Sequence, residues 1–432
     1  MNLVSLLPLF KLAAVFGLVI LLLRLSSQVG FALGLGATAL GLVFSMSPGE
    51  ILGAFGVALS EGRSLLVALI VTLILILSAS MECLGQTEEL LTRFKGRVGG
   101  RRLGFVAFPA LIGLLPMPGG AVFSAPMVDS FDREKRVPPA LKSFLNYWYR
   151  HIWEYWWPLY PAVLLASAIA DLDLWQYIIC ALPMTAVAVT AGLPQLIQVP
   201  RVVPALSHQK NQGNTPGMWR AISPFILAIL PGVGFGIFLQ FFGTSGAWAS
   251  LPKEAGLVIG LLAAVGWAWW DRSIQPHQVG LILLESKLLR MWLTLAGVFV
   301  FKGVMQQSGA AREVGEVLIH LEVPLEWMLV LLPLILGVIS GLPIAFVGAT
   351  FPILVTLIEA MGPSNMKLPF IILAFVSGFT GSIMSPLHLC LILSNEYFRA
   401  SWTSVYRRLW LPTLIILGGG IGYFWILKSL VG

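Results

Sequence analysis

The chain has 432 residues, of which 57% are hydrophobic and only 11% are charged, and its formal net charge is +7. Soluble domains carry about 25% charged residues, so this composition excludes a water-soluble globule and indicates a membrane protein. An excess of lysine and arginine is typical of the cytoplasmic loops of such proteins, so the positive charge predicts no nucleic-acid partner.

Apolar segments recur from Leu9 to Leu427. About 20 apolar residues cross the roughly 30 Å hydrocarbon core of a bilayer, so the chain is long enough for about ten transmembrane helices. Residues 9–23 are followed by Arg24 without a small-residue cleavage site, and we expect a retained helix rather than a signal peptide. The predicted fold class is an all-α polytopic membrane protein.

The first interruption of the apolar sequence is at residues 109–126, which read PALIGLLPMPGGAVFSAP. Both flanks, residues 93–102 and 133–142, are rich in lysine and arginine. The positive-inside rule places both ends in the cytoplasm, which predicts a re-entrant hairpin. Free amides at its tip would attract an anion, because a helix N-terminus carries partial positive charge. The alternative is that glycine and proline only kink and pack membrane helices.

The next segment, residues 146–161, carries charge at membrane depth. Counted from Lys142 at 1.5 Å per residue, Arg150 lies about 12 Å deep and Glu154 about 18 Å deep. Arg150 would bind a carboxylate or phosphate through two hydrogen bonds, and Glu154 or His151 would carry a proton. The alternatives are a structural ion pair between Arg150 and Glu154, and an aromatic belt from which Arg150 reaches outward.

A polar linker, residues 201–220, separates residues 1–200 from residues 221–432, and the second part repeats the first. Pro109, Gly113, Pro118 and Pro126 match Pro333, Gly337, Pro343 and Pro352. The flanks of residues 333–352 carry mainly glutamate, which predicts that the second hairpin enters from outside. We therefore expect two inverted-topology repeats, each with one re-entrant hairpin and one interrupted helix.

The second interrupted segment is residues 377–388. Carbonyl groups freed around Gly378 and Gly381, together with nearby hydroxyl groups, would hold Na⁺, or these small residues would serve close helix packing. His388 would carry a proton or bond a neighbouring helix. The predicted substrate-binding residues are Arg150, Pro118, Gly119, Gly120, Ser124, Asn146, Gly341, Pro343, Thr350, Thr380 and Ser382. The predicted coupling-ion residues are Glu154, His151, Gly378, Gly381, Ser385 and His388.

Two runs carry a resemblance that extends over nearly the whole chain: LLPMPGGAVFSAP at residues 114–126 and NYWYRHIWE at residues 146–154. They resemble the prokaryotic membrane family catalogued as domain of unknown function 401. That family is similar to the ion transporter superfamily, which includes gluconate permeases, arsenite and sodium/proton antiporters, divalent anion symporters and TRAP membrane subunits. The resemblance implies an elevator mechanism, a homodimer and the inner (plasma) membrane of a prokaryotic cell. Neither tip has the Ser-Asn-Thr pattern of the divalent anion symporters, so their sodium sites are not carried over.

We expect a secondary active transporter of a small organic anion, coupled to a proton or sodium gradient, with membrane lipid as its other partner. One alternative is a cation/proton antiporter in which Arg150 only tunes Glu154. Another is a membrane enzyme or lipid-handling protein. No Walker A, zinc-protease or Gly-x-Ser-x-Gly motif occurs, and the three cysteines lack metal-ligand spacing, so we predict no enzyme, no cofactor and no metal.

Overall fold

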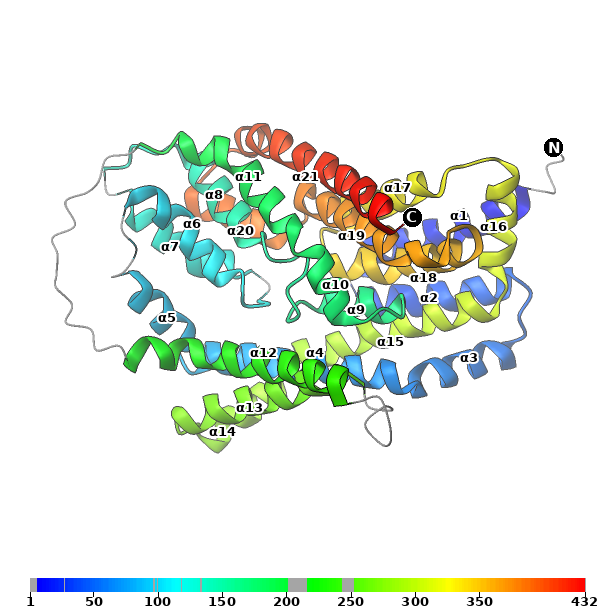
Figure 1. The fold of residues 1–432 in the computed structure, drawn as a ribbon, viewed down its shortest axis with the longest axis horizontal. Helices are drawn as coiled ribbons and strands as arrows, with labels where there is room; N and C mark the ends of the chain where they lie inside the picture. Colours follow the sequence, from blue (N-terminus) through cyan, green and yellow to red (C-terminus); the bar gives the residue numbers. More distant parts are fainter. Residues whose placement is uncertain are drawn as a thin grey trace.

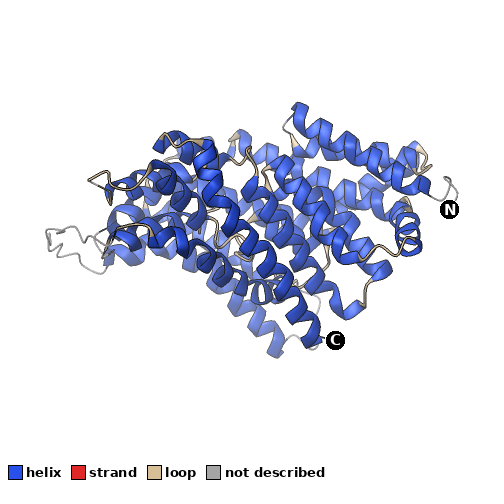
Figure 2. Cartoon of the chain, turned by 90° about the horizontal axis from the view of Figure 1, so that it is seen from above, coloured by secondary structure: helices blue, strands red, loops and turns tan. Residues whose placement is uncertain are grey.

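The computed structural model describes residues 6–26, 28–95, 98, 100–117, 119–132, 134–200, 216–242 and 252–431. Within these ranges the chain is helical and has no strand (Figures 1 and 2). Eight segments are long and apolar enough to cross a membrane, and four further apolar helices are shorter. The all-α class is confirmed, and the eight segments indicate a multi-pass membrane protein. The number of long spans is below the expected ten because four apolar helices, such as α2 and α17, have fewer than 18 residues.

The described residues of the first half form eleven helices. They are α1 (Leu7–Ser26), α2 (Val29–Val43), α3 (Pro48–Ser60), α4 (Gly62–Cys83), α5 (Gln86–Lys95), α6 (Arg101–Ile112), α7 (Ala121–Ser130), α8 (Pro139–Arg150), α9 (Pro161–Ile169), α10 (Leu174–Ala181) and α11 (Pro183–Ile197). The second half contributes α12 (Pro216–Phe242), α13 (Ala255–Asp271), α14 (Pro276–Leu283), α15 (Ser286–Gln307), α16 (Ala310–His320), α17 (Leu325–Ser340), α18 (Pro343–Met361), the short 3-10 helix η3 (Ser364–Met366), α19 (Lys367–Met384), α20 (Leu389–Phe398) and α21 (Trp402–Val431).

Helices are interrupted at both predicted glycine- and proline-rich segments. The first break separates α6 from α7, and Gly119 there has φ +75°. The second separates α17 from α18, and Gly341 there has φ +65°. This left-handed backbone is open to glycine without a steric penalty. Gly341 directly follows α17 and ends it, whereas Gly119 lies in the turn just before α7.

The two interrupted helices are also present, but one break lies later than expected. α8 ends at Arg150 and α9 begins at Pro161. α19 runs without interruption to Met384, and its break lies at residues 385–388. The expectation that Gly378 and Gly381 stand in unwound backbone is therefore wrong. Both glycines lie inside α19, where an added methyl group would overlap Phe346 or the backbone of α17, so their small size permits close helix packing.

The two sequence halves interlock rather than forming separate bodies. α7 packs against α8 and α20, and α18 packs against α19 and α9, so each broken helix pair contacts interrupted segments from both halves. α2 and α4 of the first half pack against α15 and α13 of the second. In Figure 1, α3, α4, α12, α13 and α14 lie along the lower side and α11 and α21 along the upper side.

α2 and α15 touch through glycine. A methyl group added at Gly30 would overlap the backbone carbonyl group of Leu293, and one added at Gly297 would overlap the backbone of Gly30. Small residues let two membrane helices approach to backbone contact, where packing forces are strongest. These two helices therefore form one tightly joined wall.

A buried charge cluster closes the base of the α6–α7 pair. Asp132, which follows α7, pairs with Arg101 at the start of α6, and its carboxylate also lies 3.4 Å from Lys142 Nζ on α8. The backbone N–H groups of Arg136 and Val137 donate to the same carboxylate. Buried charges are tolerated when they are paired and hydrogen-bonded. Asp132 thus joins α6, α7 and α8 at the end of the pair opposite the break.

Candidate functional site

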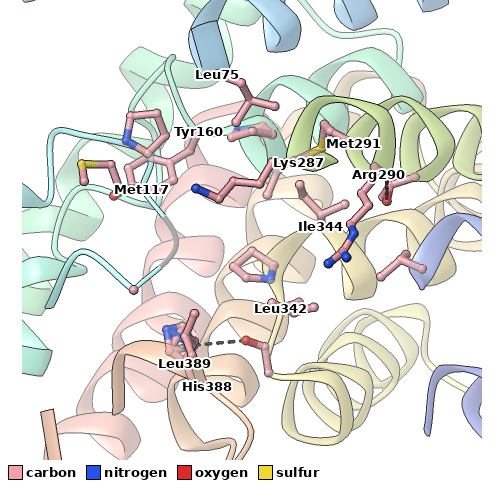
Figure 3. A pocket seen from close by; sticks show the side chains of 18 of the residues that line it. Leu75, Met117, Tyr160, Lys287, Arg290, Met291, Leu342, Ile344, His388 and Leu389 are labelled. Atoms are coloured by element: carbon pink, nitrogen blue, oxygen red, sulfur yellow. Dashed lines mark hydrogen bonds between the residues drawn. The ribbon is translucent and has the colours of Figure 1, made fainter. Parts of the chain in front are cut away.

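A cavity of about 540 Å³ lies where the broken segments, the interrupted helices and α15 meet. Its walls come from α2, α4, both broken segments, both interrupted segments and α15. Of the predicted site residues, these line it: Gly119, Arg150, His151, Glu154, Gly341, Pro343 and His388. A cavity of 300–1,000 Å³ with a few polar groups is the size that holds a small molecule. Figure 3 looks into this cavity.

Arg150 is buried at the C-terminal end of α8 and is held by the first broken segment. Its Nη2 donates to the backbone carbonyl group of Met117, and it is only 2% exposed. A Cβ atom at Gly120 would lie 2.8 Å from Arg150 Nη2, and one at Gly113 would overlap the Arg150 carbonyl oxygen. Two glycines therefore make room for this arginine. It does not reach outward to an interface, as the aromatic-belt alternative would require.

The aromatic residues after Arg150 bind the carbonyl groups that the first break leaves free. Trp153 Nε1 donates to Ala110 O at 2.8 Å, and Trp157 Nε1 donates to Leu114 O at 2.9 Å. The Tyr160 hydroxyl donates to Gly113 O at 2.6 Å. The last carbonyl groups of a helix lack intrahelical partners, and lipid supplies none. These side chains thus stabilise the non-helical backbone beside the cavity.

Two histidines, one from each interrupted helix, meet at the cavity wall. His151 Nε2 lies 3.0 Å from His388 Nε2. His151 Nδ1 lies 2.6 Å from the carbonyl oxygen of Tyr147, and His388 Nδ1 lies 3.1 Å from that of Gly341, the contact drawn as a dashed line in Figure 3. Both rings are buried, at 2% and 6% exposed.

Glu154 lies beside this pair. Its Oε1 is 3.4 Å from Arg150 Nη1 and 3.7 Å from His151 Nε2. Glu154 has the only carboxylate among the described residues that line the cavity. The Arg150–Glu154 ion pair weighed as a structural alternative is therefore present, but the same carboxylate also faces the histidine.

α15 adds two cations that the sequence reading missed. Lys287 and Arg290 line the cavity, and in Figure 3 both side chains extend into the space between Tyr160 and Leu342. Lys287 Nζ lies 2.6 Å from Glu285 Oε1, whereas Arg290 forms no ion pair within the described part of the chain. Charges three residues apart share a helix face, and this spacing inside a long apolar segment was the available signal.

Two predicted substrate residues, Ser124 and Asn146, lie away from the cavity in a polar cluster between α7, α8 and α20. Ser124 Oγ donates to Asn146 Oδ1 at 2.7 Å. Asn146 Nδ2 donates to Ala121 O at 3.0 Å and to Ser394 Oγ at 2.9 Å. The donors and acceptors of Asn146 are thus satisfied by protein. These contacts join the first broken pair to α20, and they do not face the cavity.

The predicted hydroxyl residues of the second half are also outside the cavity lining. Thr350 donates to Phe346 O within α18, and Thr380 donates to Val376 O within α19. Ser382 Oγ is buried without a hydrogen-bond partner in the described structure. Ser385 stands at the second break, where its Oγ accepts from the N–H group of Leu387. Pro118 lies outside the described residues.

A family model described as a protein of unknown function (DUF401) matches residues 3–426. No curated protein matched the chain.

Proposed function

This chain belongs to the DUF401 family of proteins of unknown function, and from its site we propose a secondary active transporter of a small organic anion, coupled to a proton or sodium gradient. The observation that carries the proposal is the charge of the cavity. Arg150, Lys287 and Arg290 line it against one carboxylate, Glu154. Arginine binds carboxylate groups through paired N–H donors, so a small carboxylate fits this lining.

The site supports an anion more than a bare cation. Glu154 is already 3.4 Å from Arg150 Nη1 and is partly neutralised by it. Arg290 has no carboxylate partner among the described residues, and an anion would supply one. The cation/proton antiporter remains the second candidate because Glu154 and two histidines are grouped at the same wall. We propose no enzymatic activity.

We further propose that the two broken helix pairs are re-entrant hairpins of inverted-topology repeats, as in the ion transporter superfamily. Their corresponding positions in the two halves and their corresponding packing, α7 on α20 and α18 on α9, support this topology. In an elevator-type motion the broken pairs and interrupted helices would move against a wall containing α2 and α15. The proposed setting is a homodimer in the inner membrane of a prokaryotic cell.

Charge movement in proteoliposomes tests the proposal. Organic acids and inorganic oxyanions are applied with and without a sodium or pH gradient, and the anion concentration for half-maximal current is measured. We expect Arg290→Gln to raise that concentration about tenfold, because loss of one charge-assisted hydrogen bond costs about 1.4 kcal/mol. Arg150→Ala is expected to abolish the current.

The matched control is Arg407→Gln, which removes an exposed arginine on α21 outside the cavity and should leave the current unchanged. If sodium or pH jumps evoked currents and no anion did, the anion-carrier proposal would be rejected in favour of the cation/proton antiporter. Turnover of a lipid in detergent, without any gradient, would support a membrane enzyme instead.

A further inference from the structure

The contact between His151 and His388 lacks a hydrogen unless a proton is added. A carbonyl oxygen only accepts hydrogen bonds, so the contacts with Tyr147 O and Gly341 O assign a hydrogen to Nδ1 of both rings. Neutral imidazole carries a single N–H group. Two neutral rings would therefore place two Nε2 atoms 3.0 Å apart with no hydrogen between them.

One additional proton resolves this conflict. Arg150 Nη1, 3.4 Å from His151 Nε2, can only donate, so the added hydrogen belongs on His388 Nε2, where it turns the contact into an N–H···N hydrogen bond of normal length. We infer that His151 and His388 together bind a single shared proton, and that this pair is the coupling-ion site of the carrier. The assignment of a coupling role rests on the proposed function, whereas the shared proton rests on the geometry of the two rings.

A proton fits this site better than a metal ion. Cys390 is the third side chain here of a type that could ligate a metal ion, and the candidate ligand atoms of the three residues lie within 4.8 Å of one another. A structural zinc site takes four ligands, with nitrogen at about 2.0 Å and sulfur at about 2.3 Å, and only three candidate ligands are grouped here among the described residues. Arg150 Nη1, only 3.4 Å from His151 Nε2, would also oppose a divalent cation. The shared proton needs no third ligand.

The surrounding charges connect the proton to an anion. Glu154 Oε1, 3.7 Å from His151 Nε2, favours the protonated pair, and Arg150 opposes it. Lys287 and Arg290 oppose it from α15 across the cavity. The other titratable groups that line the cavity or contact the segments around the pair are Tyr147, Tyr155, Tyr160, Cys390 and Tyr406.

An anion in the cavity would neutralise the opposing cations and so strengthen proton binding. Binding linkage is reciprocal, so the proton would strengthen anion binding by the same factor. Since one imidazole comes from each half, loss of the proton would leave two lone pairs opposed and weaken the contact between the interrupted helices. The pair thus predicts symport, with one proton bound at this site for each anion.

Solid-state NMR tests whether the two rings share a proton. The full-length protein is labelled with ¹⁵N-histidine, placed in liposomes and measured between about pH 5 and pH 9, the range in which histidine titrates. Wild type should show two protonated Nδ1 atoms and one hydrogen shared by the two Nε2 atoms, lost in a single event as pH rises. His151→Gln and His388→Gln assign the signals, and His277→Gln and His320→Gln, at exposed positions, are controls that should leave them unchanged.

Bare Nε2 atoms throughout this range, or two independent titrations, would overturn the inference. So would pair signals that shift when a chelator removes a metal ion. Because the spectra require no substrate and no transport, their outcome is separate from that of the transport assay.

The coupling role is tested by the pH dependence of the anion current. Either single variant should abolish the proton dependence, and His151→Gln/His388→Gln should lose no more than each alone, because one proton is shared. Additive losses would contradict sharing. A shared proton without any anion current would reject the proposed function while leaving the proton site intact.

Discussion

At the scale of single residues, the position of Arg150 depends on the absence of side chains around it. The guanidinium group rests against Gly120, and the Arg150 backbone rests against Gly113. A charged group inside a membrane protein is stable only where hydrogen bonds replace water, and Met117 O supplies one. The geometry of the proposed anion site is therefore set by the glycines of the broken segment as much as by the arginine.

Gly120→Ala tests this dependence. The added Cβ atom would lie 2.8 Å from Arg150 Nη2 and 3.0 Å from Nε, so the guanidinium group must shift. Overpacking costs about 1–3 kcal/mol, and we expect a comparable loss of anion affinity in the transport assay. Gly53→Ala is the control, because a methyl group at Gly53 meets no atom within 4 Å. If both variants bound the anion with equal affinity, the space left by Gly120 would not be required for the position of Arg150.

At the scale of helices, the α6–α7 pair is fastened at its base by Asp132. This carboxylate accepts from two backbone N–H groups and faces Arg101 and Lys142. Asp132→Asn would leave the buried Arg101 without its carboxylate, whereas Lys142 would keep Asp129 at 2.6 Å. Breaking a buried ion pair costs about 3–5 kcal/mol. We expect a marked fall in the thermal unfolding temperature in detergent.

Glu134→Gln is the matched control for Asp132→Asn. Glu134 pairs with Arg136 at an exposed position, where an ion pair contributes about 0–1 kcal/mol. It should leave the unfolding temperature nearly unchanged. If Asp132→Asn behaved like this control, the cluster would not hold the helix pair.

The helix scale also explains which parts of the fold could be predicted. Clusters of proline and glycine mark both broken segments directly, because both residue types are unfavourable inside helices and are common where helices end. Gly378 and Gly381 misled the reading of the second interrupted helix, since glycine inside a helix can equally permit close packing, and only the approach of α17 distinguishes the two. To predict Lys287 and Arg290 as cavity residues, one must know which helix faces the cavity. That depends on contacts between α15 and distant segments of the chain.

At the scale of the whole molecule, the cavity joins two groups of helices that an elevator motion would separate. Arg150, His151 and His388 come from the interrupted helices, whereas Lys287 and Arg290 come from α15. A substrate bound by both groups would lose the α15 cations when the broken pairs move. The contact between α15 and α18 is therefore the place to arrest the proposed motion.

A disulfide can provide that arrest. A Cβ atom at Gly348 on α18 would lie 3.5 Å from Cβ of Val298 on α15, which suits a disulfide. In a background without Cys83, Cys180 and Cys390, we expect oxidised Val298→Cys/Gly348→Cys to lose transport and a reductant to restore it.

The control disulfide joins α11 and α21. A Cβ atom at Gly419 would lie 3.7 Å from Cβ of Val187, so Val187→Cys/Gly419→Cys should cross-link without loss of transport. Full transport by the oxidised α15–α18 variant would show that these helices do not move apart during the cycle.

The backbone contact between α2 and α15 has a consequence for sequence variation. Neither Gly30 nor Gly297 can acquire a side chain while the two helices stay at their present separation, because each lies against the main chain of the other helix. Any larger residue at one of these positions would increase the separation of α2 and α15, whatever residue stood at the other position. Because Gly30 and Leu293 both line the cavity, a relative that retains this glycine pair is expected to retain the same pocket width, and one that has lost either glycine to accept a ligand of different size.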